Sequence, residues 1–153
     1  MAVWKEAGVE KGLIASLIDV SIGAPWSYVM EAPVGVGSPT AGQINTTAII
    51  SQVSHSDSAA MRCDNFSNPE TGTGVYTDWY LPAIWEMTQL YNAAFVVNTV
   101  LGATDGFQQT RYWSSTEFDA SSAWLKNFNS ANAATDGTLL KSVSARVRCV
   151  RRF

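Results

Sequence analysis

The hydrophobic period of this chain changes once along its length, and this change constrains the fold more than any other feature. In residues 78–101, DWYLPAIWEMTQLYNAAFVVNTVL, apolar side chains recur at helical spacing, with Ile84, Met87 and Tyr91 on one face. After residue 110 the period falls to two residues, which is the spacing of a strand. A long helix that is followed by strands, instead of alternating with them, predicts an α+β fold in a single domain over residues 1–153.

The helices have recognisable ends. Pro82 suits the first turn of the long helix, Glu86 places a negative charge near its N-terminus, and Gly102 is expected to end it. Residues 45–66 predict two shorter helices upstream. The residues expected to cap them are Thr46 or Thr47 for the first, and Ser56 or Asp57 for the second.

Short strands are predicted at both ends of the chain. The N-terminal part predicts a hairpin, with strands at residues 2–4 and 13–18 around a glycine-containing turn. The C-terminal part predicts strands in RYWSST (111–116), SAWLKNF (122–128) and SARVRCVRRF (144–153). Residues 23–43, which are rich in proline and glycine, and residues 129–140, which are small and polar, are expected to be loops.

Charge argues against several classes of protein. The net charge is −3, so the basic surface of a nucleic-acid-binding protein is missing. The sequence has no apolar run of about 18 residues, the length that a membrane helix needs, and its first residues do not resemble a signal peptide. We therefore expect a protein that stays in the cell, leaves it by assembly into a particle, or is a fragment whose export signal lies elsewhere.

Charged residues make up only 15% of the chain, which suits either packing against other subunits or a monomer with a Ser/Thr/Asn-rich surface.

The two cysteines leave two alternatives open. Cys63 and Cys149 are too few for a disulfide framework, but they could pair across the fold in an oxidising compartment. Their flanks, AAMRCDNF and VRCVR, also fit two buried, reduced thiols.

The residues that could support catalysis or metal binding are sparse. His55 is the only histidine and lies in the polar segment SQVSHSDS, where a solvated side chain is expected, so neither a catalytic triad nor a zinc site is predicted. Glu117 and Asp119 are two residues apart, which could suit a calcium site or a glycosidase pair but is more typical of a solvated turn. Arg146 and Arg148 share one face of a strand and could bind an anion, or could pair with acidic residues or a neighbouring subunit.

The tryptophans fall into two groups. Trp79, Trp113 and Trp124 stand where apolar and polar residues alternate, so we expect them to pack in the core. Trp26 and Trp85 have no such context, and either could stack on a sugar ring or close a subunit interface.

Four segments, KGLIASLIDVSIGAPWS, TDWYLPAIWEMTQLY, RYWSSTEFDASSAWLKNFNS and ARVRCVR, carry a family resemblance. In this order they are similar to the C-terminal domain family of the Legionella collagen-like protein, over about residues 3–152. The resemblance implies a C-type-lectin-like fold, with two helices packed on short antiparallel sheets. It also implies a binding domain without a cofactor, often a homotrimer, that is displayed on a cell or virus surface.

The resemblance also implies a ligand-contacting surface in the C-terminal sheet and its loops. Carried over by position, its residues are Ser121, Ser122, Leu125, Asn127, Ser130 and Asn132, with Glu117 and Asp119 beside them. Strand alternation independently places Leu125 and Asn127 on the face opposite Trp124 and Phe128, which are expected to anchor the hairpin from below. This region holds fewer asparagines than is common in the family, which lowers its capacity to hydrogen-bond a glycan.

Three hypotheses about function follow. The first is a non-enzymatic module of a phage virion surface or fibre, in which the lack of a stalk or an export signal is explained by assembly onto the particle, and which contacts neighbouring subunits or host carbohydrate. The second is a bacterial surface adhesin domain that binds sulfated glycans. The third is an enzyme related to the formylglycine-generating enzymes, which would need Cys63 and Cys149 as a copper-binding pair of thiols. No partner is expected among nucleic acids, and no insertion into a membrane.

Overall fold

The computed structural model describes residues 2–29, 34–69, 74–129 and 136–153. Over these residues the helices are α1 (Gly42–Ile50), α2 (Ala59–Asp64) and α3 (Ile84–Asp105). The strands are β1 (Ala2–Glu6), β2 (Val9–Ala15), β3 (Ser21–Ala24), β4 (Arg111–Glu117), β5 (Ser122–Asn127), β6 (Asp136–Leu140), β7 (Ala145–Val147) and β8 (Val150–Arg152). The predicted α+β class is confirmed, and the described part of the chain holds the long helix and the two shorter ones that the sequence pattern predicts, one more than the pair implied by the resemblance.

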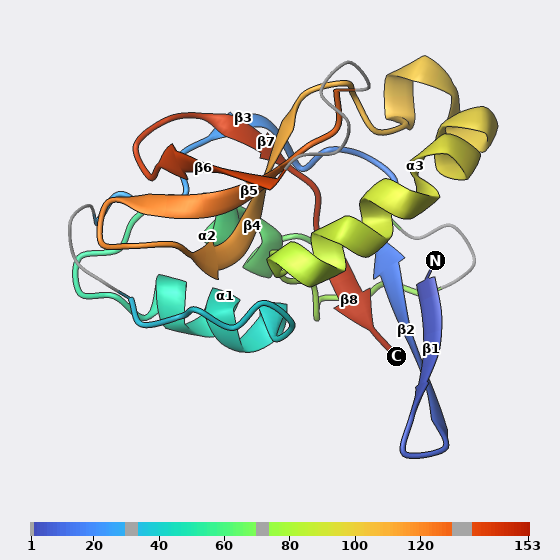
Figure 1. Ribbon diagram of the computed structural model, residues 1–153, viewed down its shortest axis with the longest axis horizontal. Helices are drawn as coiled ribbons and strands as arrows, with labels where there is room; N and C mark the ends of the chain where they lie inside the picture. Colours follow the sequence, from blue (N-terminus) through green and yellow to red (C-terminus); the bar gives the residue numbers. More distant parts are fainter. Residues whose placement is uncertain (1, 30–33, 70–73, 130–135) are drawn as a thin grey trace.

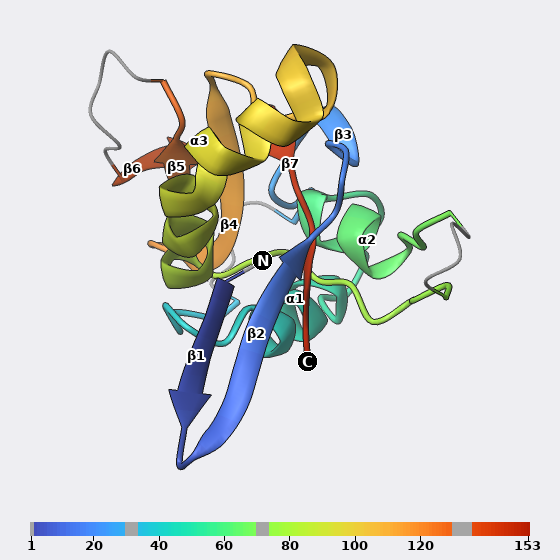
Figure 2. The same cartoon turned by 90° about the vertical axis from the view of Figure 1, so that its right-hand side faces the viewer.

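The strands form two sheets. One has the order β1-β2-β8, so that strands from the two ends of the chain lie side by side, and the other has the order β3-β7-β4-β5-β6. The expectation of purely antiparallel sheets is wrong, because β4 and β7 pair in parallel at Tyr112 and Arg146. The β1-β2 hairpin extends away from the body of the molecule (Figures 1 and 2). Figure 2 also shows β4 between α3 on one side and α2 on the other.

Two strands lie in segments that were expected to be loops. β3 is short, and its pairing with β7 is irregular between Ser21 and Ala24. β6 forms the edge of the larger sheet and pairs with β5 from Ser122–Leu140 to Lys126–Asp136. An edge strand is half exposed, so its residues do not need the apolar alternation by which a strand is recognised in a sequence.

The helix ends agree only partly with the sequence. Ser58 caps α2 and accepts a hydrogen bond from the Met61 N–H at 3.0 Å, so Ser56 and Asp57 are not the cap. α1 begins after Ala41 without a side-chain cap, and Thr46 is instead buried, where its hydroxyl accepts the Leu81 N–H. Gly102 breaks α3 as expected, with a φ of 74°, although a further turn continues to Asp105.

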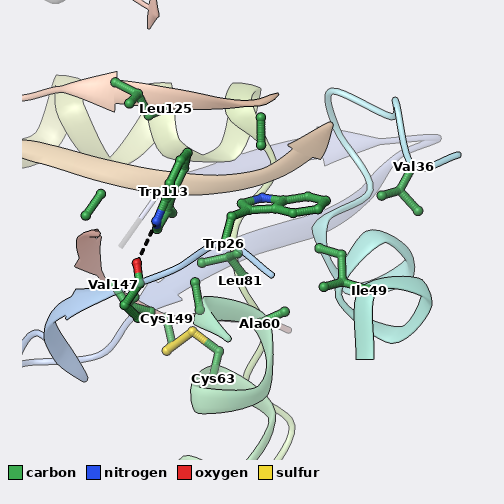
Figure 3. Packing of buried hydrophobic residues seen from close by; sticks show 14 of the residues in the cluster. Trp26, Val36, Ile49, Ala60, Cys63, Leu81, Trp113, Leu125, Val147 and Cys149 are labelled. Atoms are coloured by element: carbon green, nitrogen blue, oxygen red, sulfur yellow. Dashed lines mark hydrogen bonds between the residues drawn. A yellow bond between two sulfur atoms is a disulfide. The ribbon is translucent and has the colours of Figure 1, made fainter. Parts of the chain in front are cut away.

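The core consists of two apolar clusters on opposite faces of β4. The first contains Trp26 and Trp113 and lies against α1 and α2, as Figure 3 shows in part. The second contains Tyr112 and Phe128 and lies under α3. Tyr112 and Trp113 are neighbours on β4, so their side chains point to opposite faces of the strand and enter different clusters. Helices therefore cover both faces of this part of the sheet.

Trp26 belongs to the core, so the expectation that it could meet a sugar or a subunit is wrong. Its side chain is fully buried, and its Nε1 donates to the carbonyl oxygen of Ser114 at 2.8 Å. Trp113 is equally buried and donates to the carbonyl oxygen of Ala24 at 2.8 Å. Trp85, by contrast, is partly exposed and packs edge-on against Trp4.

The two cysteines form a disulfide. Cys63 on α2 is bonded to Cys149, which follows β7, and both side chains are fully buried in the first cluster (Figure 3). The bond joins positions 86 residues apart in sequence. The alternative of two reduced thiols is therefore wrong for this structure, and the sulfurs are enclosed by apolar side chains where a copper-binding thiol pair would need access.

Candidate functional site

Residues 117–122 lead from the end of β4 into β5 and carry half of the expected ligand contacts. Glu117, at the end of β4, is buried and forms an ion pair with Lys141, with 2.6 Å between Oε1 and Nζ. Its two carboxylate oxygens also accept the N–H groups of Val34 and Gly35 at 2.8 and 2.9 Å. This carboxylate is turned into the protein and fixes the loop before α1, so the structure does not present it to a ligand.

Lys141 completes this internal connection. Its Nζ donates to the carbonyl oxygen of Ala120 at 2.7 Å and lies 5.0 Å from the centroid of the Trp26 ring. A buried charge is tolerated when an opposite charge and hydrogen bonds compensate it. The ammonium group therefore holds the link between β4 and β5 in place from beneath.

Asp119 organises the exposed side of the same link. Its Oδ1 accepts the N–H groups of Ser121 and Ser122 at 2.8 and 2.7 Å, and also the Ser121 hydroxyl at 3.0 Å. These bonds form a side-chain-stabilised turn of the Asx type. The pKa of Asp119 is lowered, chiefly by the hydrogen bond from the Ser121 backbone. The turn presents the Ser121 side chain to solvent and leaves Ser122 half-buried.

The outward orientation expected for Leu125 is wrong. Leu125 pairs with Trp113 across β4 and β5, and its side chain is only 4% exposed in the first cluster. Trp124 and Phe128 do share the opposite face, as alternation predicted, but that face is covered only in part. Phe128 is buried beneath α3, whereas Trp124 is half-buried and packs edge-on against Phe118, with 5.2 Å between the ring centroids.

The outward surface begins where the cover of α3 ends. On β5 and β6, Ser122 lies opposite Leu140 and Trp124 opposite Thr138, so these side chains share one face of the sheet. Leu140 and Phe118 are 53% and 54% exposed. We call this the tip surface; its residues are Phe118, Ser121, Ser122, Trp124, Thr138 and Leu140.

The remaining expected contacts lie elsewhere. Asn127 is half-buried at the far end of β5, where its Oδ1 accepts the N–H of Asn129 at 3.0 Å. Ser130 and Asn132 lie outside the described residues. Sequence reasoning missed Thr138 and Leu140, because they lie on β6, which the sequence does not mark as a strand, and it did not single out Phe118, which lies in the link beside them.

Arg146 and Arg148 both form ion pairs with an acidic residue of the same chain. Of the alternatives that the sequence left open for these arginines, this is the pairing with acidic residues. Asp19 lies 2.7 Å from Arg146 Nη1 and 2.8 Å from Arg148 Nε. Arg148 is also buried and donates to several backbone carbonyl oxygens, among them that of Leu17 at 2.6 Å. Tyr112 donates its hydroxyl to the same Asp19, and burial raises the pKa of Tyr112 to about 12. Asp19 therefore compensates one of these two positive charges, and neutral backbone carbonyl oxygens hydrogen-bond the buried Arg148.

His55 lies beside Ser58, whose hydroxyl caps α2. Its Nε2 lies 2.9 Å from the Ser58 hydroxyl, and partial burial lowers its pKa against the opposing effect of Asp57. In the described part of the chain, no group of three or more His, Cys, Asp or Glu side chains is placed to hold a metal ion. Over the same residues, no helix combines the length and apolar content needed to cross a membrane.

A cavity of about 480 Å³ lies away from the tip surface. Its walls are mostly apolar and include Ile14, Phe66 and Trp79, with Asp105 and Arg151 at its edge. The lining comes from separate stretches of sequence, so no local pattern could have marked it. Arg151 is held by Asp78, with 2.7 Å between Nε and Oδ1, and its charge is therefore already paired.

Two short sheets, flanking helices and an exposed polar and aromatic edge together define an α+β domain with the construction of a binding module. The family model of the Lcl C-terminal domain matches residues 17–151. The chain therefore belongs to the Lcl C-terminal domain family, as its sequence resemblance indicated. No curated protein matches the chain.

Proposed function

We propose that this chain is a non-enzymatic binding module that is displayed on the outside of a virion or a cell. Its tip surface contacts a host-surface carbohydrate or a neighbouring protein. We also propose a C-type-lectin-like fold, which the pairing of β2 with β8 and the adjacent larger sheet support, and assembly of the chain into a homotrimer.

The arrangement of the tip surface is the observation that carries this proposal. Hydroxyl groups held by the Asp119 turn lie beside the edge-to-face pair of Phe118 and Trp124. Sugars are bound by aromatic faces that pack against their C–H groups, together with polar groups that hydrogen-bond their hydroxyls. The buried pair of Glu117 and Lys141 fixes the base of this surface, so little conformational freedom is lost on binding.

The charges around the tip surface favour a neutral glycan over a sulfated one. Glu117 is compensated by Lys141, and Lys126 by Asp136, with 2.8 Å between Nζ and Oδ1. Asp119 is exposed and adds a negative charge that repels sulfate. The sequence-based hypothesis of a sulfated ligand is therefore disfavoured at this surface.

The disulfide favours display outside the reducing interior of a cell. Such bonds persist in secreted proteins, in the periplasm and on virion or cell surfaces. Because both sulfurs are enclosed in the core, the bond has to form while the chain folds. This observation supports the second candidate, a bacterial surface adhesin that folds during export. Capsid or tail genes beside the gene would instead support the virion.

A glycan array tests the proposal. We expect the wild-type chain to bind neutral glycans, and a variant of the tip surface, Ser121→Ala/Ser122→Ala/Thr138→Ala, to lose at least about tenfold in affinity with an unchanged melting temperature. The matched control is Ser51→Ala/Ser56→Ala/Thr47→Ala, which removes the same kinds of side chain from exposed positions in and around α1.

The control variant should bind as the wild type does. Equal glycan binding by both triple variants would show that the tip surface does not bind the glycan. Binding to heparin in place of neutral glycans would contradict the charge argument while leaving a binding module in place.

A further inference from the structure

The second half of α3 exposes apolar side chains where a surface helix is normally polar. Phe95, Val96 and Val100 are 84%, 66% and 78% exposed. The opposite side of the helix carries Met87 and Leu90 in the second core cluster. A surface helix normally carries charged and polar side chains on its outer face. Here large apolar side chains share the exposed side of α3 with uncharged polar residues, among them Asn92 and Thr99.

The helix also lacks charge along this length. Between Glu86 and Asp105 no residue of the sequence is ionisable as an acid or a base at neutral pH. Exposed helices usually carry such residues on their outer face, where charged and polar side chains keep them soluble. The absence of charge and the exposure of large apolar side chains are separate observations. Both indicate that another surface covers this side of α3.

A groove runs beside these exposed side chains. It has a volume of about 340 Å³ and lies between α3 and the residues that end and follow β2. Val96 and Val100 form one wall, and Leu17, which is 63% exposed, lies on the other. We call Phe95, Val96, Val100, Leu17 and this groove the α3 patch. It combines a projecting aromatic ring with a hollow.

We propose that the α3 patch is the surface through which copies of this chain assemble. The inference rests on the self-assembly in the proposed function and names the residues that carry it. A second copy fits for a reason of charge, because two uncharged surfaces meet without repulsion and without desolvating an unpaired ion. It also fits in shape, because Phe95 of one copy can enter the groove of the next.

Other occupants match the patch less well. A partner with a charged binding surface would have to desolvate its charges against Phe95 and its neighbours, where no opposite charge compensates them. A helix that lies on an anionic membrane is rich in Lys and Arg on its polar face, and α3 has neither residue. A lipid surface remains an outcome that the experiment below distinguishes.

Sedimentation velocity over a range of concentrations tests the inference on the full chain. We expect the wild type to sediment as a multiple of its 16.5 kDa mass. Phe95→Asp, and separately Val100→Asp, should weaken association at least about 100-fold, because each buries an unpaired carboxylate in every interface. The matched control is Val53→Asp, since Val53 is 89% exposed and lies outside the patch.

Melting temperatures equal to that of the wild-type monomer would show that the variants fold, and Val53→Asp should associate as the wild type does. An oligomer that neither patch variant dissociates would overturn the inference, while the proposed self-assembly would stand. A wild-type monomer at every concentration would overturn both. A monomer that binds neutral phosphatidylcholine vesicles through Phe95 would overturn the inference in favour of lipid. Neutral-glycan binding by monomeric Phe95→Asp would leave the proposed binding function intact.

Discussion

The tip surface and the α3 patch are both exposed, but they are built in opposite ways. The tip rests on charges that are buried or bound in turns, with Glu117 and Lys141 beneath it and Asp119 within it. The α3 patch has no charge, and its helix is held by apolar packing against the second core cluster and by two hydrogen bonds between Asn98 and the backbone of Phe107.

This difference separates two kinds of contact. Polar groups that are already fixed give up little entropy when they bind, so the tip suits a ligand that is recognised by hydrogen bonds. An uncharged apolar patch gains free energy from any partner that excludes water from it, and it suits a permanent neighbour. The two proposals above therefore assign recognition to the tip surface and assembly to the α3 patch.

A large effect is expected when the charge beneath the tip is removed. Lys141→Met removes the partner of a buried carboxylate, so we expect the free energy of unfolding to fall by about 3 kcal/mol in chemical denaturation. The comparison variant is Arg62→Met, which breaks the more exposed pair with Asp57 and should cost less than about 1 kcal/mol. Equal losses of unfolding free energy in the two variants would show that the buried ion pair of Lys141 contributes no more to stability than the exposed pair of Arg62.

A second comparison separates the core from the tip through two tryptophans, Trp113 on β4 and Trp124 on β5. Trp124→Ala should cost about 2 kcal/mol, because the ring is half-buried, whereas Trp113→Ala should cost about 4 kcal/mol, as for a fully buried aromatic. Denaturant titration of the two variants checks the ratio. A larger loss for Trp124→Ala would restore it as the anchor of the hairpin.

A smaller effect is expected at the break in α3. Gly102 has a φ of 74° with open space around its Cα, so Gly102→Ala is disfavoured by backbone strain and not by a clash. We expect a loss of about 1 kcal/mol, measured as a lowered melting temperature. A stabilised variant would mean that the helix runs through this position without the break.

The smallest effect is a titration at the tip. Hydrogen bonds in the turn lower the pKa of Asp119 below its ordinary value of 3.8. A lowered pKa in the folded state means that the stabilisation is present above the ordinary pKa and is lost as the pH falls through the lowered one. Carboxyl NMR shifts should show this titration, and Ser121→Pro, which removes one N–H donor, should raise the pKa. An unshifted Asp119 in the wild type would indicate that the turn does not form in solution.

The sequence predicted those elements whose side chains repeat at a clear helical or strand period. α3, β4 and β5 show their periods clearly, and the alternation along β5 correctly grouped Trp124 with Phe128. It could not show which face points to solvent, because helices cover both sides of this sheet. Leu125 was misplaced for this reason.

The candidate site was predictable only in its local part. Asp119, Ser121 and Ser122 are close in sequence, and their turn follows from short-range hydrogen bonding. The ion pair beneath them joins residues 24 apart, and the partner of Arg146 is 127 residues away. Long-range pairing of this kind leaves no periodic signal, so the sequence left open whether the arginines bind an anion or an internal carboxylate.

Hydroxyl-radical footprinting below and above the concentration of self-association tests the division into two surfaces most directly. The account predicts that Phe95 is oxidised readily in the monomer and is protected in the assembly, while Phe118 and Trp124 remain reactive until a glycan is added. Protection of Phe118 and Trp124 on assembly, with Phe95 still reactive, would contradict it, because the tip would then be the interface between copies.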